Sequence, residues 1–298
     1  MRRPSLRHRL RSLLAAFYRP PVLGACAILL GSVIAAPHVM RLSRELSREP
    51  IYLVEGGEVK ISRPHEFVDP AFFRDALTRA DLTPPLSVAD PTLVPRLTES
   101  LGASPWVASV DHVSATLRDG VRIALTYRQP ALMVRTSGGF FAVDGEGVVL
   151  PTHDFSPDDA AKFPKLTLFD GKASGVGLRW RDERVLAAAS IVTALNAPPK
   201  SGDRSLWQQA DLVEVRPAAD GNGYELRTAV GTRVVWGEAA GDGVTEPTTD
   251  QKAGKLLSLI ERRGSLDKPA GPYRIDLRRW DVIVLEPLAV AAGDRHAL

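Results

Sequence analysis

The longest apolar stretch of the chain lies near its N-terminus. Residues 20–40 contain no ionised side chain, and residues 22–36 are nearly all apolar. At a rise of about 1.5 Å per residue, a helix of this length just spans a hydrocarbon core of ~30 Å. Six arginines precede the stretch and mixed charges follow it. Because positive charges stay on the cytoplasmic side, the pattern predicts a basic cytoplasmic tail over 1–19 and a single transmembrane helix over 20–40. The rest of the chain then lies outside the cytoplasm.

A cleavable signal peptide is the alternative interpretation of this segment. Such peptides combine a basic region, an apolar run and small residues at the cut, and the small residues around Ala35 and Ala36 partly fit that pattern. Their apolar runs are only about 7 to 15 residues long, and their basic regions are usually shorter than this one. A retained anchor is therefore the main prediction, and release by cleavage is the alternative.

The pattern changes after a polar connector at residues 41–50. Residues 51–61 alternate between apolar and polar positions, which predicts a strand with a break at its paired glycines. Asp69 and Asp90 are each followed by a proline and then by apolar residues at helical spacing. Both therefore predict the start of a helix.

Two β-rich runs follow, over residues 106–117 and 121–127, with Arg118-Asp119-Gly120 between them. An Asp-Gly pair between two such runs is a strong signal for a hairpin. The sequence therefore predicts one β-α-α-β-β domain over residues 51–130.

Short strands at close spacing dominate residues 131–288. Five Asp-Gly pairs along the chain favour antiparallel hairpins over parallel crossovers. Two helices, over residues 183–196 and 250–263, interrupt the strands. We assign this region as a mainly antiparallel β domain, followed by a flexible tail at 289–298, and the whole chain to the α+β class. The expected strands cover residues 131–135, 140–143, 148–150, 165–169, 211–216, 224–230, 232–236, 273–277 and 281–285.

The formal net charge of +3 conceals an asymmetry. The chain has 38 basic and 35 acidic side chains, and six of the basic ones lie in residues 1–19, which contain no acid. The remaining residues carry 32 basic (38 − 6) and 35 acidic side chains, a net charge of −3. The part expected outside the cytoplasm is therefore mildly acidic, which argues against nucleic acid as a partner.

A search for catalytic or ligand-binding motifs returns nothing specific. The chain has no phosphate-binding glycine loop, no G-x-S-x-G nucleophile motif and no H-E-x-x-H spacing. Its single cysteine lies in the apolar stretch, which excludes an intrachain disulfide. His153-Asp154 is the nearest approach to a catalytic pair, but adjacent residues flanked by proline are typical of a solvated turn. We predict no enzymatic activity, cofactor, metal or small-molecule substrate.

Several short motifs do form an ordered set. Residues 105–110 read PWVASV, residues 121–130 read VRIALTYRQP and residues 140–149 read FFAVDGEGVV. Residues 163–166 read FPKL, and residues 273–278 read YRIDLR. In this order behind a membrane segment, they resemble the bacterial cell-division family FtsQ, called DivIB in other lineages. The chain departs from the family pattern at Tyr127, which precedes Arg128 and stands where a glutamate is usual.

The resemblance implies a polypeptide-transport-associated (POTRA) module over residues 51–130. It also implies a non-enzymatic scaffold of the division complex, anchored in the bacterial inner membrane and enriched at the septum. Members of this family bind the coiled-coil proteins FtsB and FtsL through the last strands of the β domain. That mode is β-augmentation, in which a sheet edge accepts a strand from the partner. The corresponding partner-binding residues in this chain are Arg279, Trp280, Val282, Ile283 and Val284.

Two other classes of function stay open at this stage. The same module occurs in periplasmic scaffolds for secretion or envelope assembly, although no C-terminal pattern of ~10-residue alternating barrel strands is present. The second class is an exported protein released by signal-peptide cleavage.

Overall fold

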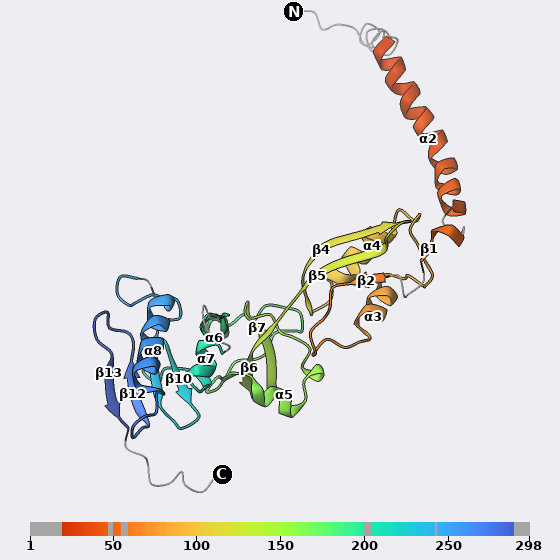
Figure 1. Ribbon diagram of the computed structural model, residues 1–298. Helices are drawn as coiled ribbons and strands as arrows, with labels where there is room; N and C mark the ends of the chain where they lie inside the picture. The colour runs from red at the N-terminus through yellow and green to blue at the C-terminus, as the bar shows by residue number, and fades with distance from the viewer. Residues whose placement is uncertain (1–19, 47–49, 55–58, 199–203, 242, 289–298) are drawn as a thin grey trace, which may run out of the picture. The chain divides into compact units, whose positions relative to one another are not determined.

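The computed structural model describes residues 20–288, except 47–49, 55–58, 199–203 and 242 (Figure 1). The tails predicted at 1–19 and 289–298 lie outside the described residues. The chain is an α+β protein, as predicted. It divides into two compact units, and each is described by itself.

The first described element is helix α2, Pro20–Leu46. Its apolar side chains between residues 28 and 39 are exposed, at 60–71% for Ile28, Leu29, Leu30, Val33, Ile34 and Val39. In the part of the chain that the structure describes, no helix combines the length and apolar character that crossing a bilayer requires. The structure therefore gives no support to the spanning segment predicted at residues 20–40.

Unit 1 comprises residues 1–62, 74–100 and 111–124. Its two helices begin at Phe72 and Leu93, three residues after the aspartates expected to start them. The carboxylate of Asp90 accepts a hydrogen bond from Thr92 N at 2.8 Å in the turn that precedes the second helix. The helices bury Ala76, Leu93 and Leu97. Strand β1 pairs with β3, and a separate three-stranded sheet has the order β2-β5-β4. The elements are β1 (Leu53–Val54), β2 (Val59–Ile61), α3 (Phe72–Arg79), β3 (Leu86–Ser87), α4 (Leu93–Gly102), β4 (Val107–Thr116) and β5 (Gly120–Tyr127), of which α3, α4, β4 and β5 extend into unit 2.

Unit 2 comprises residues 63–73, 101–110 and 125–298. Its described strands form one eight-stranded sheet with the order β13-β12-β11-β10-β9-β8-β6-β7. The strands are β6 (Pro130–Thr136), β7 (Gly139–Asp144), β8 (Lys165–Leu166), β9 (Leu212–Pro217), β10 (Tyr224–Thr228), β11 (Arg233–Gly237), β12 (Tyr273–Asp276) and β13 (Val284–Pro287). The helices are α5 (Pro157–Lys162), α6 (Glu183–Asn196), α7 (Leu206–Gln209) and α8 (Thr249–Arg263).

The large sheet is mixed, with a greater parallel share than the sequence pattern predicts. Four neighbouring pairs are antiparallel, and three are parallel. The physical reason is that α6 and α8 do not merely interrupt the strands. Each lies between two strands that pair in parallel, β8 with β9 and β11 with β12, and parallel neighbours require such a crossover. The strand expected at 148–150 is reduced to isolated bridges from Val148 and Val149.

The Asp144 carboxylate explains the VDGEG motif. One oxygen accepts hydrogen bonds from the backbone N–H groups of Glu146 and Val148, at 2.9 and 2.8 Å, and so closes the turn after β7. The other oxygen lies 2.7 Å from Nη1 of Arg128. Arg128, which follows Tyr127 in the YRQP segment, is therefore an ion-pair partner of the motif aspartate.

Helix α8 begins one residue before the predicted start and ends at Arg263, as predicted, and both of its ends are capped. Thr248 and Gln251 form a reciprocal capping box at its start, with each side chain accepting from the other residue's backbone N–H. At its end, Gly264 adopts a left-handed conformation with φ of 77°, which a side chain at Cβ would disfavour.

We predict that Thr248→Ala lowers the free energy of unfolding by about 1 kcal/mol, because a first-turn N–H of α8 loses its acceptor. The measurement is urea unfolding of the full chain. Ser190→Ala is the matched control, since that hydroxyl is exposed and donates only to Ala187 O within α6; it is expected to change stability by less than about 0.5 kcal/mol. Equal losses in the two variants would contradict the assignment of Thr248 as a cap.

Candidate partner-binding edge

Strand β13 forms one edge of the eight-stranded sheet, and its backbone alternates between the sheet and solvent. It pairs antiparallel with β12, Arg274 lying opposite Glu286 and Asp276 opposite Val284. Leu288 N donates to Pro272 O at 2.8 Å, which fixes the phase of the ladder. Because hydrogen-bonded pairs recur at every second residue, Val284 and Glu286 bond to β12. The backbone N–H and C=O groups of Leu285 therefore point away from the sheet.

The position of Pro287 agrees with this phase. Proline has no backbone N–H, so within a sheet it is restricted to edges where that group would face solvent. Pro287 lies opposite Tyr273 and, by the alternation, shares the outward orientation of Leu285. Among the described strands, β13 pairs only with β12. Its outer side therefore offers the N–H groups of Ile283 and Leu285 and a row of carbonyls that ends at Pro287.

The five residues expected to bind a partner lie at this edge, but mostly outside the strand itself. Arg279, Trp280 and Val282 belong to the connection between β12 and β13, Ile283 immediately precedes β13, and Val284 is its first residue. Trp280 is 39% exposed and Val282 is 56% exposed. The strand predicted at 281–285 is wrong by three residues at its start.

Glu286 and Pro287 are edge residues that the sequence reasoning missed. The physical reason for the shift is a tight cap on β12. Arg278 N donates to an Asp276 carboxylate oxygen at 3.0 Å, which ends the strand and turns the chain away. Pro287, seven residues after Trp280, was the available signal that the strand runs further, because prolines are tolerated at edges.

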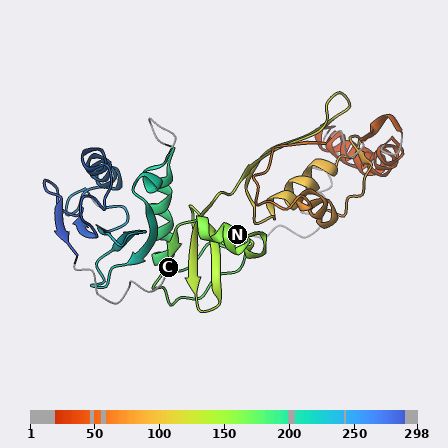
Figure 2. The same cartoon turned by 60° about the horizontal axis from the view of Figure 1, so that its bottom comes forward.

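A groove of about 560 Å³ lies between helix α8 and the β13 edge. Helix α8 runs alongside β12 and β13 in both ribbon views (Figure 1 and Figure 2). Ile283 and Leu285 face the groove from the sheet side, and Leu259 lines it from α8. A strand added to β13 would therefore direct alternate side chains into this groove. Its remaining lining is mostly polar or charged: Lys255, Ser258, Arg262, Arg263, Asp281 and Val282.

Two charged contacts hold the connection between β12 and β13. The guanidinium of Arg278 binds the Asp276 carboxylate, at 2.7 Å between Nη2 and Oδ2. Burial pushes the pKa of Asp276 upward, but the hydrogen bonds from Arg278 and the charges of Arg278 and Arg274 outweigh it, so the pKa is lowered overall. On the other side, Lys255 Nζ of α8 donates to Arg279 O. Burial, together with the charge of Lys252, lowers the pKa of Lys255 against the opposing effect of Asp281.

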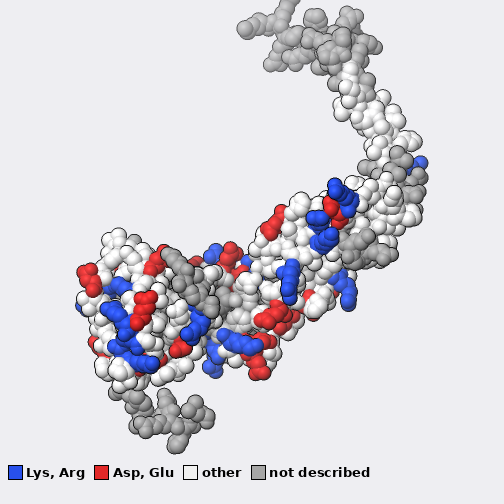
Figure 3. All heavy atoms as spheres, viewed as in Figure 1, with Lys and Arg blue, Asp and Glu red and all other residues white. Residues whose placement is uncertain are grey.

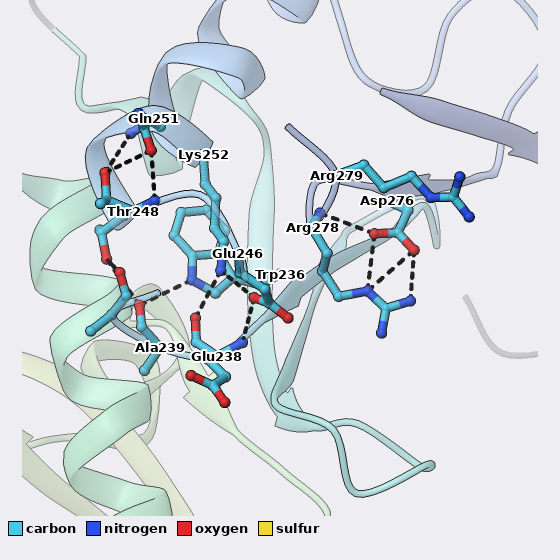
Figure 4. Close-up of polar contacts among 12 residues, drawn as sticks. Trp236, Glu238, Ala239, Glu246, Thr248, Gln251, Lys252, Asp276, Arg278 and Arg279 are labelled. Carbon is cyan, nitrogen blue, oxygen red and sulfur yellow. Dashed lines mark hydrogen bonds and ion pairs between the residues drawn. The ribbon is translucent and has the colours of Figure 1, made fainter. Parts of the chain in front are cut away.

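A fully buried lysine fixes the start of α8 (Figure 4). Lys252 Nζ lies 2.7 Å from Glu246 Oε2 and donates to Glu238 O at 3.0 Å. It also lies 5.7 Å from the centre of the Trp236 ring, within the range of a cation–π contact. Glu246 accepts a further hydrogen bond from Glu238 N. This cluster ties α8 to the segment that follows β11.

Other potential chemistry is absent from this part of the molecule or has a structural explanation. No group of three or more His, Cys, Asp or Glu side chains suited to a metal occurs among the described residues. His153 contacts Asp154 at 3.2 Å, but Asp154 also accepts a hydrogen bond from Trp106 Nε1 at 2.7 Å. On the face shown in Figure 3, basic and acidic side chains are interspersed.

The Asp276–Arg278 contact predicts a pH dependence. The pKa of Asp276 is below its ordinary value of 3.8 in the folded chain, so its stabilising contribution is complete above that value and is lost as the pH falls below it. We predict that Asp276→Asn destabilises the chain near neutral pH, and that the difference from the parent is constant down to about pH 4 and narrows as the pH falls from there to about 2. Urea unfolding of both proteins across this range measures the difference. A difference independent of pH would contradict the ion pair.

The buried lysine predicts a non-additive pair of substitutions. Glu246→Gln keeps an acceptor for Glu238 N but leaves the Lys252 ammonium buried without its counter-charge, so it is expected to destabilise the chain by roughly 3 kcal/mol. Adding Lys252→Met removes that charge, and the double variant is expected to recover part of the loss. Denaturant unfolding measures both. A double variant less stable than Glu246→Gln alone would refute this explanation.

No protein-family model matches this chain, and no curated protein matches it. Its sequence and its own geometry therefore supply the support for a function.

Proposed function

We propose that this chain is a non-enzymatic scaffold of the bacterial cell-division complex. It is anchored in the inner membrane and binds FtsB- and FtsL-like proteins by accepting a strand at β13. The order of the PWV, VDGEG and YRIDLR motifs supports the family assignment. The observation that carries the mode of binding is the outer side of β13, where Ile283 and Leu285 present backbone groups that pair with no described strand.

The anchor in this proposal is supported by the sequence, in which residues 20–40 carry no ionised side chain and follow six arginines. Apolar residues lie all around the described part of α2: Ile28, Leu29, Leu30, Val33, Ile34 and Val39. A helix that is apolar on every side is suited to an apolar environment rather than to water. The septal localisation belongs to the same proposal and follows from the family resemblance.

Several features make β13 a suitable acceptor. The strand is short and ends in proline, which limits indiscriminate pairing with other edges. Trp280 and Val282 lie exposed beside it, and tryptophan and arginine are the residue types most enriched at interface hot spots. The adjoining groove offers Leu259, Ile283 and Leu285 for apolar side chains of the incoming strand. Backbone pairing gives affinity, and the groove gives selectivity.

We predict that Ile283→Pro weakens capture of the partner about tenfold without unfolding the chain. The substitution removes one outward N–H, and a hydrogen bond is worth about 0.5 to 1.5 kcal/mol, the upper end of which corresponds to tenfold. Val284→Pro is the contrasting variant, since its N–H faces β12; it is expected to lower the free energy of unfolding as well. Co-purification of the FtsB- and FtsL-like proteins from the same bacterium, with urea unfolding, measures both effects.

Undiminished capture by the folded Ile283→Pro variant would contradict binding at this edge. Equal destabilisation by the two prolines would contradict the alternation of outward and inward residues. Leu168→Ser serves as the control for the loss of an exposed apolar side chain in the same unit and is expected to leave capture unchanged.

A further inference from the structure

Unit 1 carries a second exposed surface that the partner-binding edge does not use. A groove of about 370 Å³ lies between the segment that follows α2 and the tip of the β4–β5 hairpin. Its aliphatic lining includes Leu53, Val54 and Val88. At its rim, Ile51 is 75% exposed and Leu117 is 60% exposed. Large aliphatic side chains exposed together beside a groove mark a surface that another apolar phase covers.

Among the described residues that line this groove, the charged side chains without an ion-pair partner are both basic. Lys60 and Arg118 line it and are both exposed, and neither forms an ion pair with any described residue. Asp119 is the only acid among the lining residues, and Arg122 neutralises it at 2.7 Å. The rim therefore presents two cations beside two exposed aliphatic side chains. That combination matches the interfacial region of a bilayer, where apolar side chains enter beneath anionic headgroups and basic residues bind their phosphates.

The chain itself places a bilayer within reach. Only the residues from 47 to 50 separate the end of α2 at Leu46 from Ile51. Five steps along an extended chain reach at most about 18 Å. If α2 is the membrane anchor, Ile51 is tethered close to the lipid surface. This inference rests on the proposed function in that one respect, namely the anchor.

We propose that the surface formed by Ile51, Lys60, Leu117 and Arg118 binds the outer face of a bilayer that contains anionic phospholipid. The hairpin tip then acts as a second contact with the membrane beside the anchor, and restricts the orientation of unit 1. A protein or peptide occupant is the competing possibility, and it is an outcome of the test.

The experiment uses the full chain reconstituted in phosphatidylcholine vesicles with and without phosphatidylglycerol. The single native cysteine is removed by Cys26→Ala. A bimane fluorophore is attached at Leu117→Cys, or at Leu168→Cys as the matched control, because Leu168 is 72% exposed and belongs to unit 2. Quenching by lipid that carries a shallow nitroxide then reports contact with the bilayer.

We expect quenching at position 117 to exceed that at 168 at least about threefold when phosphatidylglycerol is present, and to fall when salt screens the charges. The double variant Lys60→Glu/Arg118→Glu is expected to bring position 117 to the level of 168. Both side chains are exposed, so this variant is expected to fold and to retain partner capture. Equal quenching at 117 and 168 overturns the proposal and leaves a protein occupant for the groove. Quenching at 117 that survives the double charge reversal also overturns it.

Flotation of the chain with vesicles at high salt tests the anchor separately. Failure to float contradicts the anchor of the proposed function. Loss of the lipid contact at Leu117 in a chain that floats and captures its partner contradicts only the present inference.

Discussion

The position of β13 at the edge of the sheet depends on one crossover. Helix α8 carries the chain from β11 to β12 so that the two strands pair in parallel, and the following reversal leaves β13 at the end of the sheet. The crossover is fixed where α8 begins, by the buried Lys252 between Glu246, the Glu238 carbonyl and the Trp236 ring. A buried ammonium is tolerated only with a close counter-charge and acceptors. This cluster therefore fixes the position of the first turn of α8 relative to the segment that follows β11.

The same helix shapes the surface that a partner would meet. Leu259 of α8 and Ile283 and Leu285 of the sheet line one groove, and Lys255 of α8 binds the Arg279 carbonyl in the connection that precedes β13. Backbone pairing at β13 is independent of sequence, because any extended segment offers the same groups. Selectivity must therefore come from side chains that enter the groove, and from Pro287, which ends the row of outward N–H groups.

Local signals in the sequence predicted much of the fold. Periodicity and Asp-Gly turns predicted the helix at 183–196, the helix at 250–263 to within one residue, and most of the short strands. The β-α-α-β-β order was predicted only in outline, because β3 lies between α3 and α4 and the first expected strand is divided into β1 and β2. The parallel pairings did not follow, because α8 contains no residue that distinguishes a crossover from an insertion. The strand expected at 281–285 was placed three residues early, since Val282 and Ile283 favour a strand and the sequence pattern gave no sign of the Asp276–Arg278 contact that ends β12. The burial of Lys252 could not be predicted either, because the sequence pattern of α8 does not distinguish a buried lysine from a solvated one.

The amides of residues 283–286 should alternate between free and bonded to β12, and residue-resolved hydrogen exchange of the full chain tests this alternation most directly. Without a partner, the amides of Ile283 and Leu285 should exchange faster than those of Val284 and Glu286, which bond to β12. Addition of the FtsB- and FtsL-like proteins should slow exchange at Ile283 and Leu285. Unchanged exchange at these two amides on binding would contradict strand addition at β13, even if exchange slowed at other residues.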